Sequence, residues 1–261
     1  NGNVTFNRTV AGSTEIFENG FTAVTGNFSY LNNAGGISYI NGSGVASGPI
    51  GGSVNITLSG GGNFSLRGIR NNLSGGTISV QDPTLAYVKN DTLLLSSFSI
   101  TGITGSGTDD FEQNAISGVV NISTAAGNTA STYLRGNIFY NDFTFTNNGS
   151  NVYESYNQTD EYRGNATFVH ANAATTFYIA YGEPTLFNRN LTVNSSNNLF
   201  SIDSLKFVGN TNAVFEQLGS QTFVFTRSVI NKTGGATVTL NDRILASGHM
   251  RFQNGRPEEH T

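Results

Sequence analysis

Apolar and polar residues alternate along much of the chain, and this alternation predicts β-strands. The clearest alternating segments carry Val, Ile, Leu or aromatic residues at every second position, at residues 4–6, 28–30, 54–58, 78–80, 143–145, 177–181, 223–225 and 238–240. Because successive side chains of a strand point to opposite faces, each segment would bury one face against a core. Clusters of Gly, Asn and Ser lie between these segments and are typical of turns. The pattern predicts an all-β protein.

One segment is a candidate for a short helix. Asn212 is a favourable cap residue, residues 213–218 include several helix formers, and Gly219 is a terminator. This is the best helical candidate in a chain whose pattern otherwise predicts an all-β protein.

Internal similarity bears on the type of β-fold. Residues 54–68 and 120–136 share Val-Asn-Ile followed by Leu-Arg-Gly, and 82–85 and 183–186 share an acidic residue followed by Pro-Thr-Leu. The spacings differ, so either a duplication carries an insertion or the matches arise by chance. A β-solenoid would show a fixed period of about 20–30 residues, and none is evident. We therefore expect a β-sandwich or jelly-roll-like fold, either one body or two tandem related sandwiches with a sub-boundary near residue 115.

Composition narrows the function. Charged residues are 11% of the chain, against about 25% in an average domain, and Asn, Ser and Thr make up about a third. The net charge of −4 lacks the positive excess that is typical of proteins that bind nucleic acid. The absence of cysteine excludes disulfides and thiol chemistry. No apolar run is long enough for a membrane helix. The chain starts without a signal peptide, which an exported protein with its leader removed would explain.

The pattern Asn-x-Ser/Thr is frequent and indicates N-glycosylation. It occurs about twice as often as the composition alone predicts. The acceptor residues are Asn3, Asn7, Asn27, Asn41, Asn55, Asn63, Asn72, Asn90, Asn121, Asn148, Asn157, Asn165, Asn190, Asn194 and Asn231. The alternative is that Asn and Thr are simply abundant. If the sites are used, covalent N-glycans would supply the solubility that charge supplies elsewhere, and the protein would lie outside the cell or on its surface.

The N-terminal segment forms a separate unit in this interpretation. Val4, Phe6 and Val10 lie on one face of a strand within residues 1–12, and residues 13–261 would form the β-sandwich body. Such a strand can be the first strand of its own sheet, or it can complete the sheet of a neighbouring subunit. Repeated head to tail, the second arrangement builds a filament.

A cysteine-free, charge-poor, sequon-rich all-β chain with an alternating N-terminal strand resembles the subunits of archaeal extracellular filaments of the thread and bundling-pilus type. The resemblance lies in composition and layout and rests on no diagnostic motif. It implies a glycosylated jelly-roll-like subunit assembled by donor-strand complementation, in which Val4, Phe6 and Val10 contact the next copy of the chain. The interruption at Arg8 departs from that pattern. An archaeal S-layer or sheath protein would share the composition.

Residues that could support catalysis or bind a metal are sparse. His170, His249 and His260 have no partner at metal-ligand spacing. Asp109, Asp110 and Glu112 lie in a glycine-bearing segment and could offer oxygen ligands to calcium, but their spacing matches no EF-hand loop and a solvated turn is the favoured interpretation. We expect no cofactor and no enzymatic activity. A secreted hydrolase is disfavoured because the chain has so few ionisable groups. Acid destabilises a folded protein when it protonates carboxylates that are ionised and paired in the native state. Because the chain has only 17 acidic residues, little stability can be lost in this way, and we also predict acid tolerance.

The leading hypothesis is a structural subunit of an extracellular, N-glycosylated filament or surface polymer, with identical subunits as partners. The alternative is a secreted carbohydrate-binding or adhesive module whose exposed tyrosines stack on sugar rings. The tyrosines considered are Tyr133, Tyr140, Tyr153, Tyr156, Tyr162, Tyr178 and Tyr181. The absence of tryptophan weakens this alternative.

Overall fold

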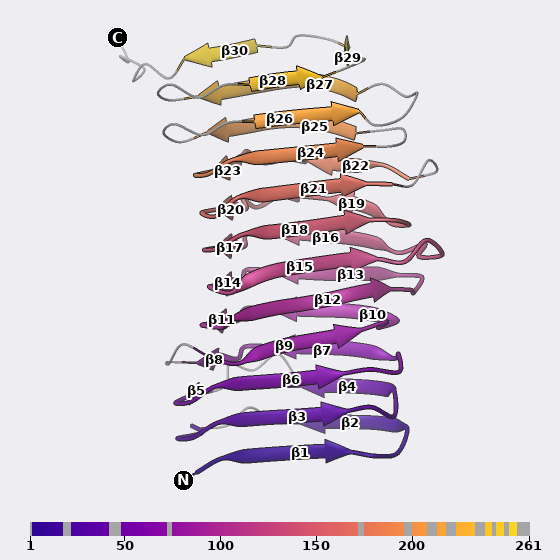
Figure 1. Ribbon diagram of the computed structural model, residues 1–261, viewed down its shortest axis with the longest axis vertical. Helices are drawn as coiled ribbons and strands as arrows, with labels where there is room; N and C mark the ends of the chain where they lie inside the picture. The colour runs from indigo at the N-terminus through magenta and orange to yellow at the C-terminus, as the bar shows by residue number, and fades with distance from the viewer. Residues whose placement is uncertain are drawn as a thin grey trace.

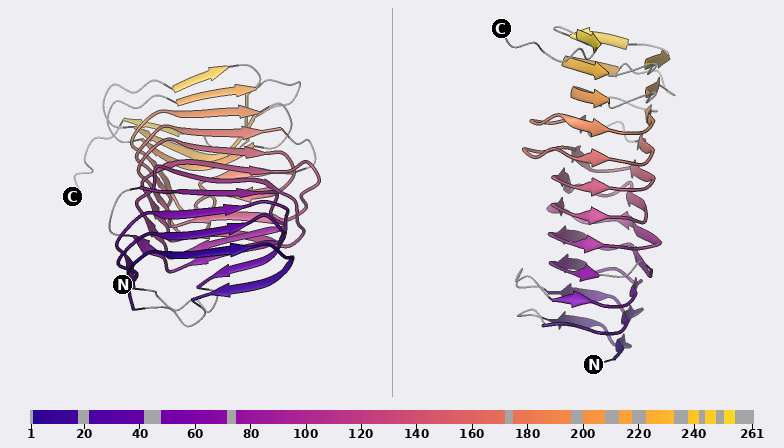
Figure 2. Two further views of the ribbon diagram at one scale, coloured as in Figure 1. Left: turned by 60° about the horizontal axis from the view of Figure 1, so that its bottom comes forward. Right: turned by 90° about the vertical axis from the view of Figure 1, so that its left-hand side faces the viewer.

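The computed structural model shows parallel β-strands wound into a solenoid (Figure 1). It describes residues 2–17, 22–41, 48–71, 75–171, 175–195, 200–207, 213–217, 223–232, 238–241, 244–247 and 251–254. Successive turns of the chain stack along one axis, so that strands far apart in sequence become neighbours (Figure 2). No helix among these residues is long and apolar enough to cross a membrane.

The turns of the solenoid contribute strands to three faces. The first face contains β1 (Val4–Arg8), β3 (Phe28–Asn32), β6 (Val54–Leu58), β9 (Thr77–Gln81), β12 (Ser97–Ile103), β15 (Val119–Thr124), β18 (Phe143–Asn147), β21 (Ala166–His170), β24 (Leu191–Ser195), β26 (Ala213–Gln217) and β28 (Val238–Asn241). The second face contains β2 (Gly12–Ile16), β4 (Gly36–Ile40), β7 (Asn63–Arg67), β10 (Leu85–Lys89), β13 (Thr108–Glu112), β16 (Ser131–Arg135), β19 (Asn151–Tyr153), β22 (Phe177–Ile179) and β29 (Ile244–Ser247). The third face contains β5 (Pro49–Ile50), β8 (Arg70–Asn71), β11 (Thr92–Leu93), β14 (Ala115–Ile116), β17 (Ile138–Phe139), β20 (Glu161–Tyr162), β23 (Thr185–Phe187) and β30 (Arg251–Asn254). Two longer strands, β25 (Phe200–Phe207) and β27 (Phe223–Lys232), take part in both the second and the third face.

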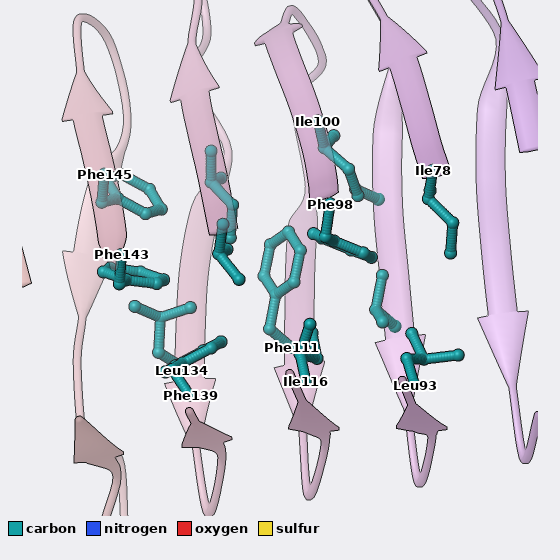
Figure 3. Close-up of a cluster of buried hydrophobic side chains, with 14 of the residues drawn as sticks. Ile78, Leu93, Phe98, Ile100, Phe111, Ile116, Leu134, Phe139, Phe143 and Phe145 are labelled. Carbon is teal, nitrogen blue, oxygen red and sulfur yellow. The ribbon is translucent and has the colours of Figure 1, made fainter. Parts of the chain in front are cut away.

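The alternating apolar residues line the interior of the solenoid as columns. On the first face, for example, Ile78, Phe98 and Val120 are paired in register and fully or almost fully buried. Figure 3 shows this interior between β9 and β18, where labelled side chains from all three faces meet. Every turn adds apolar side chains to the same columns and so buries more apolar surface. Each Å² of apolar surface buried in this way stabilises the fold by about 25 cal/mol.

A ladder of buried Asp and Asn side chains joins the turns at the corner between the second and third faces. Its members are 23 residues apart: Asp91, Asn114, Asn137 and Asp160. Each side-chain Oδ1 accepts the backbone N–H of the turn before it, for example Asn137 Oδ1 from Asn114 N at 3.1 Å. Buried backbone donors at this corner are thereby satisfied where no strand ladder continues.

The β-sandwich or jelly-roll expectation, in one body or in two, is wrong, although the all-β prediction is confirmed. The strands pair in parallel, and the pairing continues without a break through the sub-boundary expected near residue 115. The period was missed because the turns differ in length. Paired residues on the first face lie between 20 positions apart (Ile78 and Phe98) and 26 positions apart (Phe28 and Val54). Variable corners blur a repeat whose strands pair in register, apart from a register shift in β12 and another in β25.

The helical candidate forms a strand instead. Residues 213–217 form strand β26, which pairs with β24 and β28, while Asn212 and residues 218–219 lie outside the described part of the chain. In-register pairing on both sides outweighs the helical propensity of this short segment.

The N-terminal strand belongs to the solenoid itself. β1 pairs in parallel with β3 in the first face, so that Val4 lies opposite Phe28 and Phe6 opposite Tyr30. Phe6 is 38% exposed and Val10 is 73% exposed. The structure thus uses β1 as the first strand of its own sheet.

Candidate functional site

Five tyrosines gather on the outer side of the second face and form the most distinctive surface of the described chain. We call them the tyrosine cluster: Tyr133, Tyr153, Tyr156, Tyr178 and Tyr181. Half of the ten tyrosines in the sequence therefore lie within two neighbouring turns and the strand before them.

Three members of the cluster form a stack because their strands are in register. Tyr133, Tyr153 and Tyr178 are directly paired across β16, β19 and β22. Their ring centroids are 5.0 Å apart at both steps, with interplanar angles of 14° and 10°. This repeat follows the distance between neighbouring strands, about 4.8 Å. The ring planes are thus stacked along the solenoid axis, with their edges towards solvent.

The other two members form a strip beside the stack. Tyr156 and Tyr181 are parallel within 4°, with centroids 5.7 Å apart, and each is steeply inclined to the stack. Because they follow β19 and β22 in successive turns, they are displaced from each other along the axis. The two rings form an elongated aromatic strip whose planes are inclined by 64–74° to the rings of the stack, and Tyr181 is 40% exposed there.

Buried acids fix the backbone from which the strip projects. Tyr156 and Tyr181 each follow a non-glycine residue in the left-handed region, Ser155 at φ 52° and Ala180 at φ 60°. Such residues cost free energy unless their surroundings hold them in place. Glu154 Oε2 accepts the N–H of Ala180 at 2.7 Å, and Asp160 Oδ2 accepts the N–H of Ser155 at 2.8 Å.

The titration of these acids follows from their burial. Both side chains are inaccessible to solvent, and burial raises the pKa of each above its ordinary range. The charge of Asp160 raises the pKa of Glu154 further. A substrate cannot reach either carboxyl group, so the pair positions the aromatic strip and is not an acid–base pair for hydrolysis.

A compact ion cluster lies next to the stack on the same face. Asp110 contacts both Lys89 and Arg135, and Arg135 Nε donates to Asp110 Oδ1 at 3.0 Å. Glu112 lies 3.1 Å from Lys89 Nζ and 3.3 Å from Arg135 Nη2. Burial lowers the pKa of Arg135, but the hydrogen bond and charge of Asp110 and the charge of Glu112 outweigh it, so that the pKa is raised. The two acids and two bases compensate one another, which leaves the tyrosine cluster in a neutral setting.

The calcium candidates are divided between the two sides of β13. Asp110 and Glu112 point outwards into the ion cluster, whereas Asp109 points inwards and accepts hydrogen bonds from Ala86 N and Thr132 Oγ1. Alternation along the strand separates them. The described residues contain no group of three His, Asp or Glu side chains that could hold a metal ion.

The remaining sequence candidates lie elsewhere. Tyr140 is 42% exposed and its ring lies 4.6 Å from the guanidinium carbon of Arg163, away from the cluster. Tyr162 is buried in the column between Phe139 and Phe187. His170 is buried, with Nε2 at 2.9 Å from the carbonyl oxygen of Thr175, and His249 and His260 lie outside the described residues.

The predicted glycosylation sites differ in accessibility. Eight of the acceptor side chains are exposed: Asn3, Asn7, Asn27, Asn90, Asn121, Asn157, Asn165 and Asn190. Four are partly exposed: Asn55, Asn63, Asn148 and Asn194. Asn41 is buried and its Nδ2 donates to the carbonyl of Arg67 at 2.5 Å, so this nitrogen cannot carry a glycan in the folded protein. Asn72 and the side chain of Asn231 lie outside the described part.

Many asparagines have a structural role that sequence reasoning missed. Asn3 Oδ1 accepts the N–H of Asn27, and Asn27 Oδ1 accepts the N–H of Ser53, so that even exposed acceptor residues join successive turns. The spacing of 23 residues in the Asp/Asn ladder was the available signal. The abundance of Asn thus has a cause in the fold that is independent of glycosylation.

Comparison of the chain with protein-family models, with curated proteins and with solved structures found no match.

Proposed function

We propose that the chain is a non-enzymatic, carbohydrate-binding module of an exported surface protein, and that the tyrosine cluster is its binding face. The observation that carries the proposal is the convergence of five tyrosines on one outer face, two of them in a strip parallel to the solenoid axis. Tyrosine combines a flat apolar ring with a hydroxyl group at little conformational cost, which suits the alternating apolar and hydroxyl faces of a sugar.

The electrostatics of the cluster agree with this role. Burial, with the neighbouring tyrosine hydroxyls, raises the pKa of Tyr153 above its ordinary value, so its phenol is protonated and can donate a hydrogen bond at neutral pH. The rings are held by their neighbours in register and by the buried acids beneath them. Such preorganisation lowers the entropy lost when a ligand binds.

The proposal is tested by binding to arrayed oligosaccharides and polysaccharides, with two tyrosine variants of similar exposure. We expect wild-type protein and Tyr140→Ala to bind the same saccharides, because Tyr140 is 42% exposed but lies outside the cluster. Tyr181→Ala, which removes a 40% exposed ring of the strip, should weaken binding at least about fivefold. Equal weakening by both variants, or no saccharide bound by wild type, would contradict the proposal.

Assembly into a filament or surface polymer is a second candidate function. Among the described residues no strand pairs with the outer edge of β1, and the ring of Phe6 is partly exposed at this end of the solenoid. An open edge of this kind can accept a further parallel strand. Electron microscopy of the purified protein tests it: filaments that are lost on Phe6→Lys support strand addition, and dispersed particles at all concentrations oppose it.

A further inference from the structure

A groove lined by small, uncharged residues lies beside the tyrosine cluster on the same side of the molecule. It has a volume of about 370 Å³ and is lined by residues 126–129 of one turn, Gly149 and Asn151 of the next, and Thr175 of the turn after that. This is at the lower end of the range for small-molecule sites and is sufficient for one sugar residue.

The groove and the cluster are continuous. Asn151 and Tyr153 are two residues apart in β19, with the buried Val152 between them, so both face outwards. A ligand chain that runs along β19 would therefore pass from the groove to Tyr153 within one strand repeat of two residues, about 7 Å.

The walls of the groove are rigid and uncharged. Asn128 Nδ2 donates to Ile103 O at 2.9 Å while its Oδ1 accepts from Ala130 N, and Asn151 Oδ1 accepts from Thr176 N at 3.0 Å. These bonds fix the loop in place. None of the lining residues is ionisable.

One group in the groove is poised for a ligand. The hydroxyl oxygen of Thr175 is buried and has no hydrogen-bond partner. A buried hydroxyl without a partner is unfavourable, and rotation about χ1 of Thr175, a residue that lines the groove, would let the hydroxyl donate to and accept from a sugar hydroxyl.

We infer that this groove is a subsite for a neutral hexose, and that the ligand of the tyrosine cluster is a polysaccharide of uncharged hexoses. The inference rests on the proposed carbohydrate-binding function and adds the class of sugar and a hydrogen-bonding subsite. Uronic acids are disfavoured because the groove offers no cation, and the nearby Lys89 and Arg135 are already compensated by Asp110 and Glu112.

The test is calorimetric titration with hexasaccharides of glucose, mannose and galacturonic acid, using wild type and three variants. Thr175→Val replaces only the hydroxyl with a methyl group and should weaken binding of the neutral probe about fivefold, which is about 1 kcal/mol. Gly127→Trp should block the groove and abolish measurable binding. Gly127→Ala is its matched control, because a Cβ at Gly127 meets no atom within 4 Å, and it should bind as wild type does.

The outcomes separate the two proposals. Absence of binding by wild type to both neutral probes overturns this inference, whereas the carbohydrate-binding function falls only if none of the arrayed saccharides is bound either. Binding that is lost in Tyr181→Ala but unchanged in Thr175→Val and Gly127→Trp overturns the groove alone. Tighter binding of the galacturonate probe than of both neutral probes overturns the assignment to uncharged hexoses. Circular dichroism spectra matching wild type establish that each variant is folded.

Discussion

Replacement of Asp91 by Asn should stabilise the protein at alkaline pH and leave its stability unchanged in acid. Asp91 occupies a position of the Asp/Asn ladder, where its Oδ1 accepts the N–H of Ile69 at 2.6 Å. Its Oδ2 is buried without a hydrogen-bond partner, and burial raises the pKa of the carboxyl group well above its ordinary value. At the equivalent atom, Asn114 Nδ2 donates to the carbonyl of Val88 at 2.7 Å.

The magnitude follows from this comparison. Val88 pairs in register with Leu66, so an amide at position 91 would donate to the carbonyl of Leu66 as Asn114 does to that of Val88. The substitution removes an unsatisfied buried oxygen and adds one hydrogen bond, which together are worth about 1–3 kcal/mol. In acid the protonated carboxyl of Asp91 can make the same donation, and the difference between the two proteins should fall towards zero.

The assay is urea unfolding of wild type and Asp91→Asn at pH 4 and pH 8. Asp160→Asn is a matched control. Both Asp160 oxygens accept N–H groups, one from Asn137 and one from Ser155, so the NH₂ of an amide side chain would face one of these N–H donors without an acceptor between them. We expect Asp160→Asn to destabilise the protein by about 1–3 kcal/mol at pH 8. Asp91→Asn that destabilises at both pH values, or stabilises equally at both, would refute the reasoning.

Three further predictions concern pH, glycines and glycans. Burial raises the pKa of Asp109 to about 6, so the folded state holds this proton more firmly than the unfolded chain. The free energy of unfolding of wild type relative to Asp109→Asn should therefore fall by about 3 kcal/mol from pH 3 to a pH well above 6, and an equal pH dependence of the two proteins would count against it. Gly62→Ala should destabilise the protein by about 3 kcal/mol or more, because Gly62 has a φ of 92° and its added Cβ would lie 1.8 Å from the carbonyl oxygen of Gly36. In the same denaturation assay, Gly127→Ala should change the free energy of unfolding by less than about 0.5 kcal/mol. Mass spectrometry of protein from a glycosylating host should find Asn41 unmodified and exposed sites such as Asn90 occupied, and a glycan on Asn41 of folded protein would contradict the burial of its amide.

Local pattern predicted the strands better than it predicted their arrangement. Alternation such as Phe143-x-Phe145 reports which side chains are buried, and those residues are indeed in the core. It does not report whether a strand pairs with an antiparallel neighbour or with the next turn of a solenoid. That choice depends on contacts between residues 20 or more positions apart, and corners of unequal length concealed the period of these contacts.

The candidate site was predictable in its residue types and not in its geometry. All five members of the tyrosine cluster were among the tyrosines considered, but Tyr162 was among them too and is buried. Only the register brings Tyr133, Tyr153 and Tyr178 together, since they lie 20 and 25 positions apart in the sequence. The buried acids beneath the strip had no sequence signal, because Glu154 and Asp160 resemble ordinary surface residues until the fold encloses them.

The most direct test of carbohydrate binding by the tyrosine cluster is NMR of the protein with isotope-labelled tyrosine rings, titrated with a neutral hexose hexasaccharide. The ten tyrosines of the chain can be assigned by single substitution. We predict that the ring signals of Tyr153, Tyr156, Tyr178 and Tyr181 shift in proportion to bound ligand, while those of Tyr140 and the buried Tyr162 do not. Saturable binding that shifts Tyr140 and leaves the cluster unchanged, or no shift in any ring, would contradict the proposed function.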